Sequence, residues 1–203
     1  MDTLLEHYPE KKRKLLDVAL KLMLAKGYHA TTVDEICAEA KVTKGSYFHY
    51  FKSKEDAAKE TLAYFGLLQQ GLLQNSGIEN EKDPWARLQK FLDFYLLVSR
   101  NPDLPNSCLA STFAQELSED YPELRVMCEA NFVMNAQPLI EIVTDCKNVY
   151  APQALFDPVS VAEYFISLYQ GSLILAKAKL DPTIITTNVE YFRAYMNTLI
   201  RKP

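Results

Sequence analysis

The segment from residue 31 to residue 54, TTVDEICAEAKVTKGSYFHYFKSK, strongly constrains what this chain can fold into. A helix start at Thr31 and Thr32 leads into a short amphipathic helix, a tight turn follows at residues 41–43, and a second short helix then begins. This order predicts a helix-turn-helix motif at about residues 32–51, whose second helix is short enough to lie in a DNA major groove. Because four lysines and no acidic residue lie from residue 40 to residue 54, the segment predicts a DNA-binding element.

Capping residues mark where the helices of this region begin and end. Gly27 stands where a left-handed residue would end the first amphipathic helix. Thr32 and Glu35 have the T-x-x-E spacing of a capping box, which predicts the start of the second helix. Thr43 and Ser53 are expected to cap the next two helices, because a hydroxyl at this position accepts a hydrogen bond from a free backbone amide.

The rest of the chain also has helical periodicity, and no β-type alternation persists for more than a few residues. Pro and Asp interrupt the periodic stretches, as at residues 101–103, and residues 75–84 form a polar linker. The sequence therefore predicts an all-α protein with an N-terminal three-helix helix-turn-helix domain at residues 9–60 and a C-terminal helical domain at residues 61–203. We expect helices at about residues 9–26, 32–40, 43–51, 53–73, 84–100, 106–118, 122–148, 157–180 and 183–201.

Composition narrows the possible classes of protein. The 203 residues are 48% hydrophobic, which is enough for a large core, and the net charge of −4 argues against coating nucleic acid over the whole surface. The four cysteines are widely spaced without a CxxC pair, the N-terminus lacks the apolar stretch of a signal peptide, and no segment is expected to cross a membrane. We therefore expect a cytoplasmic chain with reduced thiols.

Enzymatic motifs are missing from the sequence. It contains no nucleophile elbow, phosphate-binding loop, glycine-rich dinucleotide turn or metal-ligand spacing, so we expect no catalytic residue, no metal site and no cofactor.

The second helix of the motif is the candidate for contact with double-stranded DNA. Short polar side chains suit base edges, while lysine, tyrosine and histidine suit phosphate oxygens. Lys54 and the two threonines at residues 31 and 32 lie at helix starts, where a backbone phosphate would also bind. Phe48 and Phe51 are expected to be core residues. Thr32 is expected to serve mainly as a helix cap and only secondarily as a DNA contact. The candidate DNA contacts are Thr31, Thr32, Thr43, Lys44, Gly45, Ser46, Tyr47, His49, Tyr50 and Lys54.

The motif resembles the TetR family of bacterial transcriptional repressors. The family pattern T-T-x-x-x-I-A-x-x-A-G-V-S-x-G-x-x-Y-x-x-F-x-x-K matches this chain at nearly every position. One departure is Lys41, which stands where the family has glycine; a left-handed conformation there would cost roughly 1 kcal/mol. At the other defined positions of the pattern this chain reads Thr31, Thr32, Ile36, Cys37, Ala40, Val42, Thr43, Gly45, Phe48, Phe51 and Lys54.

The resemblance implies a homodimer that binds a palindromic operator and is released by a small-molecule effector. Broad apolar faces on the two last helices support dimerisation independently, although these helices could instead pack only within one chain. The candidate interface residues are Val161, Tyr164, Phe165, Leu168, Leu175, Phe192, Tyr195, Met196 and Leu199.

An effector pocket would lie among the central helices, although aromatic residues there serve packing in any core. The candidates are Trp85, Phe91, Phe94, Tyr95, Cys108, Phe113, Met127 and Phe132.

Cys108 is a candidate for a reactive thiol. It precedes a helix, where the helix dipole lowers a thiol pKa, and the phrase around it resembles that of electrophile-sensing TetR relatives. In that branch a lysine late in the dimer helix lies near the cysteine, and Lys177 is the candidate here. The alternative is a buried, inert cysteine.

Two further alternatives stay open at this stage. One is a helical ligand carrier or enzyme with a vestigial DNA-binding head, which would not bind DNA in a salt-dependent manner. The other is a constitutive DNA-binding protein without an effector.

Overall fold

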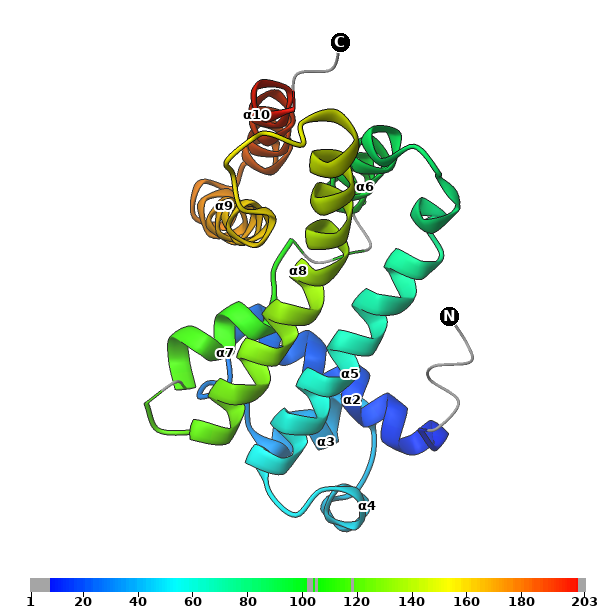
Figure 1. Ribbon diagram of the computed structural model, residues 1–203. Coiled ribbons are helices and arrows are strands. Elements are labelled where there is room, and N and C mark those ends of the chain that lie inside the picture. Colours follow the sequence, from blue (N-terminus) through cyan, green and yellow to red (C-terminus); the bar gives the residue numbers. More distant parts are fainter. Residues whose placement is uncertain (1–7, 102–103, 105, 118, 201–203) are drawn as a thin grey trace. The chain divides into compact units, whose positions relative to one another are not determined.

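The computed structural model describes residues 8–101, 104, 106–117 and 119–200, and every regular element in these residues is a helix (Figure 1). The all-α class is therefore confirmed. The expected helix ends at residues 118 and 201, and the break at residues 102–103, lie outside the described residues. The elements are α2 (Glu10–Lys26), α3 (Val33–Ala40), α4 (Lys44–Tyr50), α5 (Lys54–Gln74), the 3-10 helix η1 (Ile78–Asn80), α6 (Pro84–Arg100), α7 (Leu109–Leu117), α8 (Pro122–Tyr150), α9 (Pro158–Lys179) and α10 (Thr183–Leu199).

The chain divides into two compact units. Unit 1 runs to Asn75 and also takes in Cys108–Asn131, so it holds α2 to α5, α7 and the first part of α8. Unit 2 takes in Ser76–Ser107 and the chain from Phe132 onward, and so holds α6, α9, α10 and the rest of α8. The expected domain boundary at residue 60 stays a prediction. The helix-turn-helix belongs to the same compact unit as α7.

The core of unit 1 forms where α2 packs against α3, α5 and α7. Leu15 and Met23 of α2 and Ile36 of α3 are completely buried, as the apolar periodicity of these helices requires. Phe113 of α7 is also completely buried, so a helix from much later in the chain completes this core.

The three predicted N-terminal caps of unit 1, at Thr32, Thr43 and Ser53, are confirmed, whereas Gly27 ends α2 with φ of 83° and ψ of 177°, which is not the expected left-handed helical conformation. Thr32 Oγ1 accepts a hydrogen bond from the Glu35 amide at 3.2 Å, and the Glu35 carboxylate accepts from the Thr32 amide at 3.0 Å, which forms the reciprocal capping box. Thr43 and Ser53 likewise accept from the backbone amide three residues later. These local bonds set where α3, α4 and α5 begin.

Three phenylalanines form the centre of unit 2. Phe91 of α6, Phe165 of α9 and Phe192 of α10 are at most 1% exposed. The ring centroids of Phe165 and Phe192 are 4.8 Å apart, and those of Phe91 and Phe165 are 5.7 Å apart. Arg193 of α10 pairs with Asp93 of α6 at 2.6 Å, which ties the same helices together at the surface.

α9 is unusually apolar. Its most apolar 18-residue window has a mean hydropathy of 1.3, so by length and composition it is apolar enough to cross a membrane. This stretch is longer and more apolar than expected, but the core helix of a soluble protein passes the same test, so the finding does not show a membrane-crossing segment. Only 33% of the window is buried within the chain, where Phe165 packs against α6 and α10. Much of the apolar surface of α9 is thus left uncovered.

Lys41 ends α3 with φ of 55° and ψ of 45°, so this lysine adopts the left-handed conformation at the position where the family has glycine. Lys41→Gly should raise the free energy of unfolding by roughly 0.5–1 kcal/mol, because glycine adopts this conformation without a Cβ clash. Urea-induced unfolding measures the change. Lys41→Ala keeps the Cβ and should leave stability unchanged, whereas Leu180→Gly, at a second left-handed residue (φ 54°), should also stabilise. Equal stability of Lys41→Gly and Lys41→Ala would contradict the prediction.

Candidate nucleic-acid interface

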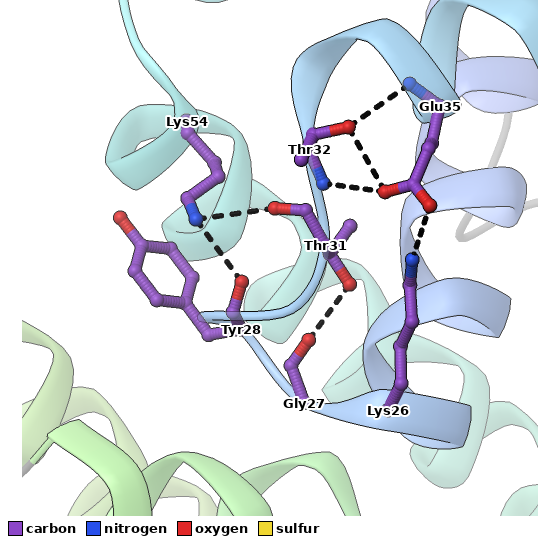
Figure 2. Close-up of polar contacts among 7 residues, drawn as sticks. All are labelled: Lys26, Gly27, Tyr28, Thr31, Thr32, Glu35 and Lys54. Carbon is purple, nitrogen blue, oxygen red and sulfur yellow. Dashed lines mark hydrogen bonds and ion pairs between the residues drawn. The ribbon is translucent and has the colours of Figure 1, made fainter.

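The α2–α3 loop, residues 27–32, is held by a lysine from α5 (Figure 2). Lys54 Nζ donates to the carbonyl oxygens of Tyr28 and Thr31, both at 3.1 Å, and lies 4.1 Å from the centroid of the Tyr28 ring. Carbonyl oxygens and an aromatic face both attract a cation. Burial lowers the pKa of Lys54, and the carboxylate of Glu116 acts in the opposite direction. The expectation that Lys54 points outward to clamp a phosphate is therefore wrong: its ammonium group fixes this loop.

A carboxylate holds the same loop through its amides. Glu116 of α7 accepts from the main-chain amides of Tyr28 at 2.7 Å and His29 at 3.4 Å. Gly27 permits this approach, because its φ of 83° suits glycine and a Cβ there would lie 1.8 Å from a Glu116 carboxylate oxygen. No local sequence pattern points to Glu116, since 88 residues separate it from Tyr28.

The loop ends at the capping box, which carries an additional ion pair (Figure 2). Lys26 Nζ donates to Glu35 at 2.5 Å, while Thr32 donates to the same carboxylate through its amide and its hydroxyl. These hydrogen bonds, with that from Lys26 the strongest, lower the pKa of Glu35 to about 2. The carboxylate is therefore ionised at neutral pH, and the start of α3 is fixed under physiological conditions.

α4 presents most of the expected DNA-contacting residues on an exposed face. Lys44, Gly45 and His49 are exposed, and Ser46 and Tyr50 are half-buried. Thr32 and Thr43 are also exposed, although their hydroxyls already serve as caps.

Two of the expected contacts are core residues instead. Thr31 and Tyr47 are completely buried. The Thr31 hydroxyl donates to the Gly27 carbonyl at 2.7 Å, and the Tyr47 hydroxyl donates to the Ser53 carbonyl at 3.4 Å. Their side chains therefore do not reach a phosphate in this conformation, and the expectation is wrong for both.

The neighbouring phenylalanines differ from one another. Phe51 is 2% exposed, as expected for a core residue, whereas Phe48 is 52% exposed on the outer face of α4. The core expectation for Phe48 is therefore wrong. Tyr47 occupies the core position in its place, because consecutive residues of a helix point about 100° apart.

Lys44, the first residue of α4, is a cation on the exposed face of this helix. It pairs with Asp34 of α3 at 2.6 Å, and the two side chains are 62% and 68% exposed. Ion pairs this exposed contribute little to stability because water screens them, so a phosphate can replace Asp34 at little cost. Lys41 and Lys52, at either end of the same motif, are also exposed.

The expected effector-pocket residues are divided between the units. Trp85, Phe91, Phe94, Tyr95 and Phe132 belong to unit 2, and the Tyr95 ring lies 5.0 Å from Phe91 and 4.7 Å from Tyr169. Their role in binding an effector stays a prediction.

Unit 1 holds the other three pocket candidates, Cys108, Phe113 and Met127. Phe113 is completely buried and packs edge-on against Tyr28 with 6.1 Å between ring centroids. Phe113 thus supports the α2–α3 loop.

The four cysteines are free and buried. Cys108 directly precedes α7, as expected, and is 4% exposed. Burial raises the pKa of the Cys128 thiol to about 11 and that of Cys146 to about 12, and it also raises the pKa of Cys37. A reactive thiol needs access, so this burial favours the structural alternative for Cys108. Lys177, its proposed partner, is an exposed residue of unit 2.

The expected dimer residues also separate by burial. Val161, Phe165, Phe192 and Met196 are at most 5% exposed and fill the core of unit 2, so the interface expectation is wrong for these four. The others remain accessible to a second chain: Tyr164, Leu175 and Tyr195 are exposed, while Leu168 and Leu199 are partly exposed.

Lys54→Met should lower the free energy of unfolding by about 2 kcal/mol, because two loop carbonyls lose a charged hydrogen-bond donor. Chemical unfolding followed by circular dichroism measures the loss. Lys52→Met is the matched control: this lysine is exposed, and its replacement should leave stability unchanged. If Lys54→Met were as stable as wild type, Lys54 would be a surface lysine and the assignment to the loop would fail.

Comparison with known proteins agrees with this geometry. Residues 15–61 match the sequence model of the bacterial regulatory proteins of the tetR family. The transcriptional regulator AcuR of Cereibacter sphaeroides is 26% identical over 173 residues, which cover 84% of this chain and 78% of that protein. The HTH-type transcriptional repressor DhaR of a Mycobacterium species is 24% identical over 166 residues, 82% of each chain.

A crystal structure of a TetR transcriptional regulator from Chloroflexus aurantiacus has the same fold. It superposes with a TM-score of 0.83 over 94% of this chain and 96% of that chain, at 21% sequence identity. The matched segment identifies residues 15–61 as a DNA-binding domain of the tetR type, the relatives along most of the chain are transcriptional regulators, and the fold is that of a TetR regulator.

Proposed function

We propose that the chain is a dimeric transcriptional repressor that binds a palindromic DNA operator through α4 and is released by a small-molecule effector. The observation that carries the proposal is the exposed face of α4, which offers Lys44, Gly45 and His49 to a groove while Tyr47 and Phe51 anchor the helix from behind. The mode of regulation follows the commoner one in the family and the name of the relative DhaR, which is a repressor.

The charge of the motif supports contact with a polyanion. Lys41, Lys44 and Lys52 are exposed around α4, and no acidic residue lies on the chain between them. The exposed Asp34 of α3 neutralises only Lys44, through an ion pair that is easily exchanged. Phosphates at the rim of a major groove would then bind these cations and release condensed counterions.

The uncovered apolar surface of α9 and α10 supports dimerisation. Tyr164 and Leu175 of α9 are 48% and 47% exposed, and Tyr195 of α10 is 38% exposed, with its ring centroid 5.5 Å from that of Tyr164. A second copy of the same two helices would cover these side chains in a four-helix interface. Two α4 helices, one from each chain, would then bind the two halves of a palindrome.

Effector release requires a link between other helices and the DNA-binding motif. Lys54 of α5 and Glu116 of α7 hold the carbonyls and amides of the same α2–α3 loop. A shift of either helix would therefore move the loop or break these bonds, and α3 and α4 follow the loop directly. An effector that binds one position of α5 or α7 more tightly would change the affinity for DNA by this route.

Lys44→Ala should weaken binding to duplex DNA and reduce the slope of log affinity against log salt by about one, because one phosphate contact is lost. The duplex is selected by wild-type protein from a random double-stranded library, and fluorescence anisotropy measures affinity at several salt concentrations. Lys82→Ala removes an exposed lysine outside the motif and should bind like wild type. A wild-type chain that selects no duplex, or whose affinity ignores salt, would rule out the proposed function.

Leu175→Asp should convert the dimer into a monomer, because it places a charge in the proposed apolar interface. Light scattering of the purified variant at micromolar concentration measures its mass. Leu180→Asp is the matched control: Leu180 follows the end of α9, is 90% exposed and should tolerate a charge without loss of the dimer. A Leu175→Asp variant that stays dimeric would place the interface elsewhere.

A further inference from the structure

Phe48 is a large apolar side chain on the face of α4 that would enter the groove. It is 52% exposed, and its ring meets Tyr47 edge-on with 5.3 Å between centroids. Tyr47 is the residue that fills the core, so the packing of α4 does not require a phenyl group at the next position. The outer face of the helix therefore combines an apolar ring with polar neighbours.

The neighbours of Phe48 along the chain are cationic or polar. Lys44 precedes it by one helical turn, His49 follows it, and Lys52 lies four residues later; all three are exposed. A partner that suits this surface has negative charge around an apolar group. The DNA major groove has both, because phosphates line its rims and the 5-methyl group of thymine projects into it.

Gly45 leaves the helix backbone bare beside Phe48. A Cβ at this position would meet only Thr43 Oγ1, at 3.8 Å, so the space inside the fold does not demand glycine. Glycine is less favourable than alanine inside a helix, because it loses more backbone freedom on folding. The missing side chain has a purpose if another molecule approaches the backbone closely at this point. Gly45 lies three residues before Phe48 and thus on the same side of the helix.

We propose that Phe48 is a specificity-determining residue that recognises the 5-methyl group of a thymine in each operator half-site. The inference rests on the proposed function, since it places α4 in the major groove. A phenyl ring has no hydrogen-bond donor or acceptor for a base edge, so it recognises the methyl group by apolar contact. Thymine alone among the four unmodified bases carries that methyl group.

The test removes the methyl group and nothing else. In the duplex selected by wild-type protein, each thymine is replaced singly by deoxyuridine, at symmetric positions of both half-sites, and fluorescence anisotropy measures affinity. One position should lose affinity by about three- to five-fold per half-site, the value expected for one buried methyl group. Phe48→Ala should bind more weakly and show no further loss with deoxyuridine at that position. Phe48→Tyr keeps the ring and should retain the sensitivity.

Each outcome separates this proposal from the proposed function. Wild-type protein that binds its selected duplex but is insensitive to deoxyuridine at every position overturns methyl recognition and leaves DNA binding intact. Phe48→Ala that keeps both wild-type affinity and wild-type sensitivity also overturns it. Failure to select any duplex overturns both proposals. Thermal unfolding of Phe48→Ala should match wild type, because the side chain is largely exposed.

Discussion

The ammonium group of Lys54 holds two carbonyl oxygens of the α2–α3 loop, and the position of the helix-turn-helix depends on that contact. The loop leads into the capping box that begins α3, and the turn after α3 leads into α4. Glu116 holds the same loop with the opposite charge: its carboxylate accepts hydrogen bonds from the amides of Tyr28 and His29. A cation on carbonyls and an anion on amides satisfy the polar groups of a loop that has no regular structure of its own. Gly27 makes this close approach sterically possible.

The aromatic residues at positions 47, 48 and 51, in and directly after α4, have two roles. Tyr47 and Phe51 pack inward and hold α4 against the rest of unit 1, whereas Phe48 is left on the outside. Because Tyr47 and Phe51 hold α4 from its inner side, the outer face can carry cationic residues and a glycine, Gly45, without loss of the helix. The surface available to DNA is therefore narrower than the set of polar residues in the segment suggests, and it includes one apolar ring.

The features that were predictable from sequence are those that depend on neighbours along the chain. The capping box at Thr32 and Glu35 follows from two residues three positions apart, and it is confirmed. The long-range contact of Glu116 with Tyr28 leaves no such pattern, because the partners are 88 residues apart. For the same reason Lys54 was assigned to a phosphate, when its partners are loop carbonyls from before α3.

Prediction of which side chains are buried also fails where aromatic residues are adjacent or where a helix is apolar on more than one side. Tyr47 and Phe48 have similar size and apolar character, so the periodicity of a seven-residue helix does not decide which one points inward. In α9 and α10, apolar residues cover both the side that packs in unit 2 and the side that is exposed. Phe192 and Tyr195 illustrate the ambiguity: they are three residues apart on one helix, but 1% and 38% exposed.

The most direct test of this account is the map of amide chemical-shift changes when the selected duplex is added to isotopically labelled protein. The account predicts large changes at Lys44, Phe48 and His49 on the exposed face of α4. It also predicts little change at the amides of Tyr28 and His29, because Lys54 and Glu116 still hold the α2–α3 loop in the complex. Changes concentrated in α6 and α10, with α4 unaffected at saturating duplex, would contradict the central claim that α4 is the DNA-reading helix.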